Sequence, residues 1–253
     1  AEGLTVLRTV RHKNKLKRSH GRSNRFEVTI RDVPAGGIDR ARAVLAELAR
    51  VGAPNTFGPQ RFGRDGDNAD RARAFLLGEE RAPKNRRIKS LMISALQSKV
   101  FNRVFTLRLE RGLWTTALEG DVMKKHDTGG LFDVTDPAAE QPRLERLEIS
   151  PTAAMPGPKA RSASGEAQAL EDQALADVDI DASLVAKLDV GTRRSLRFPL
   201  AEDDRIEAVG DDAYTLFVTL PSGAFATVLL AELMKPPGGE VLRTAGDDLA
   251  VDD

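Results

Sequence analysis

The sequence of 253 residues contains no cysteine, which excludes a disulfide framework, a thiolate metal site and a cysteine nucleophile. It has only three histidines, His12, His20 and His126, and these leave little material for a zinc site. Its longest apolar runs are far shorter than the roughly 18 residues that cross a bilayer, so we expect no membrane-spanning helix. The motifs G-x-x-x-x-G-K-[ST], H-E-x-x-H and G-x-S-x-G are also missing.

The charges balance overall but are unevenly distributed along the chain. Lys and Arg number 38, as do Asp and Glu, and a net charge of zero excludes a wholly basic nucleic-acid coat protein. Residues 1–25 carry eight basic residues and a single acid, whereas residues 201–253 carry twelve acidic residues and three basic ones. Such an asymmetry suggests that one face binds a polyanion, although a solvated charge run without a partner explains the composition equally well.

The basic segment leads directly into a stretch with the alternation of a half-buried strand. Phe26, Val28 and Ile30 are apolar, and Glu27 and Thr29 lie between them. A basic loop that is anchored by a strand positions phosphates better than a disordered arm does, which favours the polyanion interpretation. On this pattern alone, Phe26 belongs to the core.

Hydrophobic periodicity and turn residues predict a mixture of helices and strands. The predicted helices cover residues 38–51, 68–77, 88–109, 165–176 and 224–234. The predicted strands cover residues 4–10, 26–30, 193–198 and 214–220, a hairpin surrounds the turn at 127–130, and residues 151–165 are turn-rich and basic. Because strands and helices do not alternate regularly, the pattern favours an α+β fold.

The helix predicted at 88–109 has the clearest apolar stripe, which consists of Ile88, Leu91, Met92, Ala95, Leu96, Phe101, Val104 and Phe105. The segment 52–68 is dense in Gly, Pro and Asn and reads as a loop. This loop also contains Phe57, Phe62 and Arg61, which a passive linker does not need. We expect the two phenylalanines to pack the loop rather than to touch RNA. Arg61 either holds the loop together or meets a phosphate, and the residues do not separate these roles.

A series of short segments occurs in an order that resembles one protein family. The first two read R-H-x-x-K-L … N-x-F, at residues 11–26, and N-x-F-G-x-Q-R-F-G … N, at residues 55–68. Further matches lie at residues 94–102, 120–121, 150–152, 156–157, 191–194 and 221–227. The ordered set is similar to the tRNA pseudouridine synthase D (TruD) family and covers nearly the whole chain.

The resemblance implies a pseudouridine synthase core, with a mixed and mostly antiparallel sheet, interrupted by a family-specific α/β insertion. We map the core to residues 1–50 and 200–253 and the insertion to residues 51–199. The implied reaction is the isomerisation of a uridine in tRNA, usually uridine 13, to pseudouridine without metal or organic cofactor. The resemblance further implies a cytoplasmic protein, favoured as a monomer, that binds tRNA and no membrane.

The resemblance also implies roles for particular residues. Phe26 and Phe225 match the two phenylalanines that hold the uracil, and Asn24 matches the asparagine beside the catalytic aspartate and the target nucleotide. Without the resemblance, both phenylalanines read as core residues and Asn24 as a turn residue. The candidate contacts to RNA phosphates are Arg11, His12, Lys13, Lys15, Lys17, Arg18, Arg22 and Arg61.

One departure from the family pattern concerns the nucleophile. Members carry a catalytic aspartate in a G-x-K-D-type motif shortly before the R-H-x-x-K-L segment, and no such string occurs in this chain. Only ten residues precede Arg11, none of them is Asp, and the first residue is Ala1 rather than Met. We therefore expect an N-terminal truncation, a nucleophile upstream of Ala1 and an inactive chain as given. The alternatives are a non-catalytic tRNA-binding module and a globular protein that binds no RNA.

Overall fold

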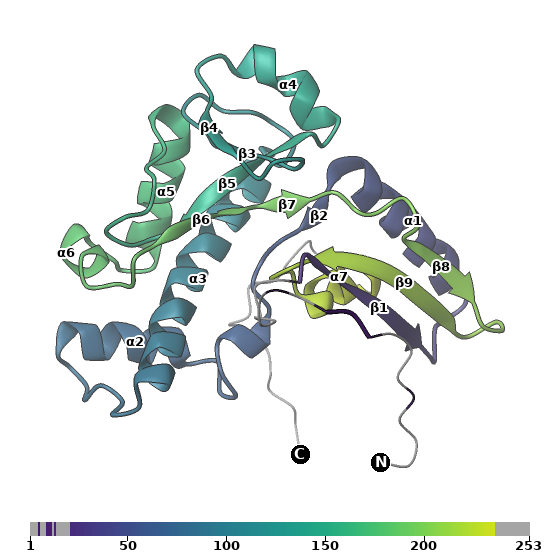
Figure 1. Cartoon of the computed structure of the whole chain (residues 1–253), viewed down its shortest axis with the longest axis horizontal. Coiled ribbons are helices and arrows are strands. Elements are labelled where there is room, and N and C mark those ends of the chain that lie inside the picture. The colour runs from purple at the N-terminus through teal and green to yellow at the C-terminus, as the bar shows by residue number, and fades with distance from the viewer. Residues whose placement is uncertain (1–4, 6–8, 12, 14–20, 236–253) are drawn as a thin grey trace.

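The computed structural model describes residue 5, residues 9–11, residue 13 and residues 21–235 (Figure 1). Within these residues the strands form three sheets, with the orders β1-β9-β8, β2-β7 and β4-β3-β5-β6. Every strand pair in the described part of the chain is antiparallel. Helices and antiparallel sheets together confirm the predicted α+β class. The strand predicted at 4–10 falls mostly outside the described residues.

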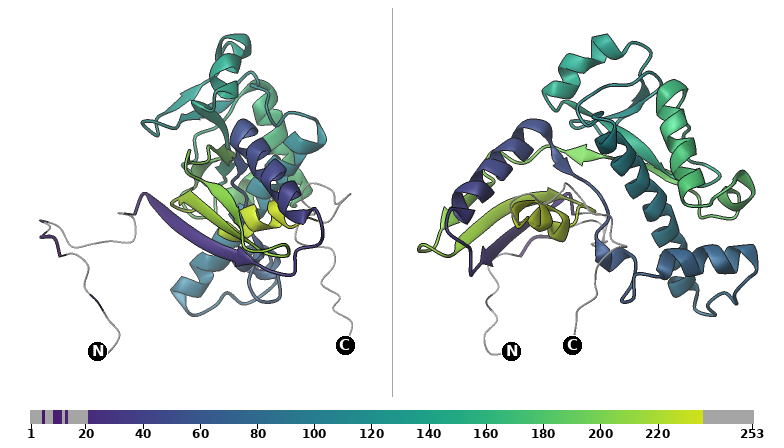
Figure 2. Two further views of the ribbon diagram at one scale, coloured as in Figure 1. Left: turned by 90° about the vertical axis from the view of Figure 1, so that its right-hand side faces the viewer. Right: turned by 180° about the vertical axis from the view of Figure 1, so that it is seen from behind.

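The three-stranded sheet places β9 (Tyr214–Pro221) between β1 (Ser23–Ile30) and β8 (Arg205–Ala208). The predicted alternation of β1 is confirmed, because Phe26, Val28 and Ile30 are half-buried and their neighbours are exposed. Helices α1 (Gly37–Val51) and α7 (Ala226–Leu233) pack on this apolar face (Figure 2). We call the resulting hydrophobic core the sheet cluster; its central members are Ala41, Leu45, Leu48, Leu216, Val218, Leu220, Leu229 and Leu233.

The second hydrophobic core, the helix cluster, is built around α3 (Arg86–Glu110), which runs through the middle of the larger part of the molecule (Figure 1). Asn85 caps this helix by accepting hydrogen bonds from the backbone N–H groups of the next turn. The predicted stripe is correct from Met92 onward but wrong at its start. Ile88 and Leu91, near the start of α3, are each 48% exposed.

Four strands and four further helices complete the larger part. The strands are β3 (Val122–Lys125), β4 (Leu131–Asp133), β5 (Ile149–Met155) and β6 (Thr192–Ser195), and β3 and β4 form the predicted hairpin. The helices are α2 (Asn68–Leu77), α4 (Pro137–Glu145), α5 (Gly165–Asp177) and α6 (Ala182–Val185). Sequence patterns missed β5, which was read from residue 151 as turn-rich. This strand is buried along almost its whole length, so it shows no alternation.

The chain passes between the two parts at two neighbouring points, β2 (Ala53–Pro54) and β7 (Arg197–Phe198), which pair with each other. The loop between β2 and α2 contains one 3₁₀ turn, Pro59–Arg61. The sheet cluster is built from residues before β2 and after β7 and from the two strands themselves. The predicted division into a core, residues 1–50 and 200–253, and an insertion, residues 51–199, stays a prediction.

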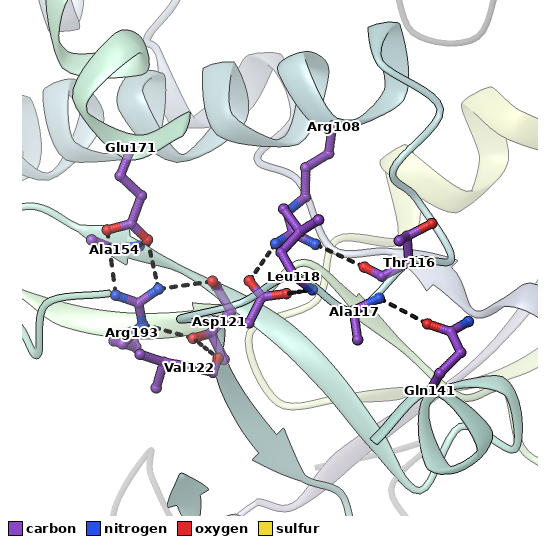
Figure 3. A network of polar contacts seen from close by, with 11 residues as sticks. Arg108, Thr116, Ala117, Leu118, Asp121, Val122, Gln141, Ala154, Glu171 and Arg193 are labelled. Atoms are coloured by element: carbon purple, nitrogen blue, oxygen red, sulfur yellow. Dashed lines mark hydrogen bonds and ion pairs between the residues drawn. The ribbon is translucent and has the colours of Figure 1, made fainter. Parts of the chain in front are cut away.

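Two buried arginines of the larger part are paired with carboxylates (Figure 3). Arg108 on α3 donates to Asp121, and both side chains are at most 2% exposed. Arg193 on β6 lies 2.5 Å from Glu171 on α5, between Nη2 and Oε1. Burying a guanidinium without a partner is costly, so these pairs neutralise charge inside the fold.

Candidate functional site

The residues expected to hold the uracil come from one end of the three-stranded sheet. Asn24 is paired with Leu220 across β1 and β9, and Phe26 is paired with Val218. Immediately beyond this pairing, the backbone N–H of Ser222 donates to the carbonyl oxygen of Arg22 at 2.9 Å. The start of β1 therefore lies beside the turn 221–225, which ends in Phe225.

Phe225 differs from its predicted placement, since we expected it within a helix starting at Ala224. Its backbone is extended, with φ −106° and ψ 118°, and α7 begins at Ala226. The Pro-Ser-Gly turn before it explains the difference, because Gly223 adopts a φ of 90° that no helix contains. Phe225 is thus presented from the end of a turn.

The two phenylalanine rings pack against different clusters. Phe26 is half-buried against the sheet cluster, whereas Phe225 is half-buried against the helix cluster. Among the described residues no direct ring contact joins them, and Asn24 beside them is exposed. Their shared role in holding a uracil therefore stays a prediction.

The predicted phosphate contacts are only partly described. Arg11, Lys13 and Arg22 are exposed, and Arg22 directly precedes β1. Four others, His12, Lys15, Lys17 and Arg18, lie outside the described residues. The exposed positions leave these side chains accessible to a polyanion, and their contacts with RNA stay a prediction.

The loop 55–63 is held against α3, and its aromatic residues pack as expected. Phe57 and Phe62 are both 8% exposed and belong to the helix cluster. The ring of Phe57 meets that of Phe225 edge-on, with 5.7 Å between centroids. Gln60 adds a contact to the same region, because its Nε2 donates to Oγ1 of Thr227 at 3.1 Å. The loop therefore braces the start of α7.

Arg61 performs the loop-holding role that the sequence left open. Its Nε donates to Oγ of Ser98 at 3.0 Å, and its Nη2 donates to Oγ of Ser94. Its guanidinium carbon lies 5.1 Å from the ring centroid of Phe57. Burial lowers the pKa of Arg61 from its ordinary value. The predicted phosphate contact is not tested by these bonds, since Nη1 takes no part in them.

Arg194 adjoins the candidate site and was not singled out from the sequence, although it stands in the matched segment 191–194. Its Nε donates to the carbonyl oxygen of Asn55 at 2.8 Å, and its Nη2 donates to that of Gly223 at 2.9 Å. Its guanidinium carbon lies 4.3 Å from the centroid of Phe57. Burial, and secondarily the charge of Arg61, lower the pKa of Arg194 to about 10. Arg194 therefore ties β6 to the turn that presents Phe225.

The described residues contain no group of three or more His, Cys, Asp or Glu side chains arranged to hold a metal ion. Nor does any helix in the described part have the length and apolarity needed to cross a membrane.

Comparison with known proteins agrees with the sequence resemblance. A family model described as tRNA pseudouridine synthase D (TruD) matches residues 2–81 and 68–233. A tRNA pseudouridine synthase D from an Anaeromyxobacter species is 45% identical over 259 residues, which cover 98% of this chain and 71% of the relative. The Thermus thermophilus protein of that name is 42% identical, over 92% of this chain and 64% of its own length.

A solved structure shows the same fold. The crystal structure of the Methanosarcina mazei protein described as tRNA pseudouridine synthase D superposes with a TM-score of 0.68 at 19% identity. The superposition covers 84% of this chain and 69% of that protein.

Proposed function

The chain belongs to the tRNA pseudouridine synthase D family, whose reaction is the isomerisation of a uridine in tRNA to pseudouridine, and we propose that its target is uridine 13. The observation that carries the site assignment is the pairing of β1 with β9. This pairing and the bond between Ser222 and Arg22 bring Asn24 and the turn of Phe225 to one end of the same sheet.

The proposed residues supply binding and orientation. A base must leave the stack before it can react, and unstacking costs a few kcal/mol. Stacking on an aromatic ring contributes about 1–3 kcal/mol per base and tolerates rotation of the ring in its plane. Once the bond between N1 of the uracil and the ribose breaks, Phe26 and Phe225 retain the detached base while it turns. The base then bonds to the ribose through carbon 5, which loses its proton. The amide of Asn24 both donates and accepts, so it can orient the nucleotide.

We further propose that the nucleophilic aspartate is supplied by residues upstream of Ala1 and that the 253 residues alone do not turn over tRNA. The support is that no G-x-K-D string occurs in the chain. The test compares this chain with a version extended by the upstream coding sequence, using tRNA tritiated at uridine C5 and measuring tritium release. We expect release only from the extended protein, and none from a tRNA with cytidine at position 13.

The second candidate is a non-catalytic tRNA-binding module, which the absence of the aspartate motif favours. Tritium release by the 253-residue chain would contradict both the proposed inactivity and this second candidate. An extended protein that binds tRNA but releases no tritium would favour the module.

A further inference from the structure

The loop 55–63, β6 and the turn 221–225 meet at a contact region that we call the seam. We propose that Arg61 and Arg194 form an anion site at the seam, and that its ligand is a backbone phosphate of the tRNA next to the flipped uridine. This inference rests on the proposed function, because it places the site beside Phe225.

Both guanidinium groups are gathered on one aromatic ring. The guanidinium carbons of Arg194 and Arg61 lie 4.3 Å and 5.1 Å from the centroid of Phe57. Attraction to the ring favours each cation. The two positive charges nevertheless repel each other, and the charge of Arg61 lowers the pKa of Arg194. An anion that contacts both guanidinium groups would offset that repulsion.

The described residues give this pair no negative partner. Arg108 and Arg193, which are equally part of the larger half, are each bonded to a buried carboxylate (Figure 3). By contrast, neither Arg61 nor Arg194 takes part in any ion pair of the described residues, and their acceptors are neutral serine, amide and carbonyl oxygens. Partly desolvated cations that lack a counter-charge are typical of sites that bind an anion.

The arginines also keep donors available for a ligand. Each guanidinium uses Nε and Nη2 within the protein, and Nη1 has no acceptor among the described residues. In that part of the chain, the only fully buried side-chain nitrogen or oxygen atoms without a hydrogen-bond partner are Nε of Arg197 and Oε1 of Glu232. Nη1 of Arg61 and Nη1 of Arg194 are therefore not completely buried. Arg197 differs, since it is 1% exposed and closed to any ligand.

The position of the pair favours an RNA phosphate as its anion. Arg194 bonds to Gly223, and Phe57 contacts Phe225, so the pair adjoins the turn proposed to hold the base. Guanidinium forks match the geometry of phosphate oxygens. Such contacts fix the position of the RNA and read no sequence, which suits an enzyme that must hold the strand while one base is extruded.

The test measures tRNA affinity as a function of salt for Arg61→Gln, Arg194→Gln and the double variant. Glutamine removes the charge while keeping a polar side chain, and melting curves check that each variant folds. The matched control is Arg42→Gln, an exposed position on α1. One phosphate contact contributes about 0.7–0.9 to the slope of log K against log salt. We expect the slope to become shallower by about that amount in each single variant and to stay unchanged in the control.

The double variant tests whether the two arginines share one phosphate. We expect its slope to become shallower by about the same amount as in either single variant, because only one phosphate contact is removed. Unchanged slopes in the single variants would overturn the proposal, and a doubled loss in the double variant would show two separate contacts instead of one site.

A second measurement distinguishes an RNA phosphate from free phosphate as the ligand. It also separates failure of the anion site from failure of the proposed function. Inorganic phosphate should raise the melting temperature of the original chain more than that of folded Arg61→Gln or Arg194→Gln. If the chain binds no tRNA but shows this phosphate effect, the proposed function fails and the site takes free anions, which overturns the RNA assignment. If neither phosphate nor tRNA distinguishes the variants, there is no anion site.

Discussion

Asn102 on α3 forms two hydrogen bonds with the backbone of Phe57, donating from Nδ2 to its carbonyl oxygen and accepting from its N–H, each at 2.9 Å. The side chain thus satisfies the loop as a neighbouring strand would. Ser98 and Ser94, one and two turns earlier on α3, hold Arg61 of the same loop. Three polar residues at a spacing of four therefore fix the segment that braces Phe225.

The variant Asn102→Asp tests this arrangement. A carboxylate can still accept from the N–H of Phe57, but it leaves the carbonyl oxygen without a donor. We expect the free energy of unfolding to fall by about 1–3 kcal/mol, as measured by urea denaturation. The same substitution at Asn85, which only accepts hydrogen bonds at the start of α3, should change it by no more than about 0.5 kcal/mol. Equal losses of stability at Asn102 and Asn85 would contradict the view that both hydrogen bonds of Asn102 stabilise the loop.

A second prediction concerns Phe26→Ala in the protein extended to include the nucleophile. Losing one stacking ring removes about 1–3 kcal/mol, so we expect turnover to fall about tenfold to a hundredfold while tRNA affinity stays nearly constant. Tritium release and filter binding measure the two quantities. Phe217→Ala is the matched control, since Phe217 points to the opposite face of the sheet under Arg205. If Phe26→Ala lowers affinity as much as turnover, Phe26 is structural.

The buried pair of Arg108 and Asp121 predicts a large loss of stability. Asp121→Ala removes the partner of a fully buried guanidinium and an acceptor of the N–H of Leu118. We expect the free energy of unfolding to fall by about 3–5 kcal/mol. The exposed pair of Arg161 and Asp133 provides the comparison, and Asp133→Ala should cost at most about 1 kcal/mol. Similar losses in chemical denaturation would show that burial of the first pair has no energetic consequence.

His126 predicts a pH dependence of stability. Burial, followed by the charges of Lys124 and Arg197 and opposed by Asp127, lowers the pKa of His126 from 6.5 to about 4. Below pH 6.5 the unfolded chain binds a proton that the folded one excludes, so stability falls as the pH drops from about 6.5 to about 4. The loss from this group is at most about 3 kcal/mol. His126→Gln should make stability less dependent on pH in that window, as measured by denaturation at several pH values, and an unchanged profile would contradict it.

The elements with one buried face were predictable from the sequence, and the fully buried ones were not. β1 shows an alternation because one side of its sheet is covered by helices and the other is not. β5 lies inside the four-stranded sheet, so nearly every position is buried and the period disappears. Pro151 within it reads as a turn residue in sequence, yet it pairs with Met123 in the sheet.

For the candidate site, the sequence leads no further than the resemblance does. Asn24, Phe26 and Phe225 are singled out by matching segments, and their roles stay predictions. The role of Arg194 depends on contacts with Asn55 and Gly223, which are distant in sequence and share no pattern with it. Only folding brings these three together, and no periodicity or local motif signals such an arrangement.

The pairing of Ala53 with Phe198 has an evolutionary consequence. Because β2 and β7 are paired, the segment between them leaves and rejoins the rest of the chain at neighbouring residues. This segment can therefore change in length or sequence between related proteins while the three-stranded sheet keeps its register, provided that β2 and β7 stay side by side.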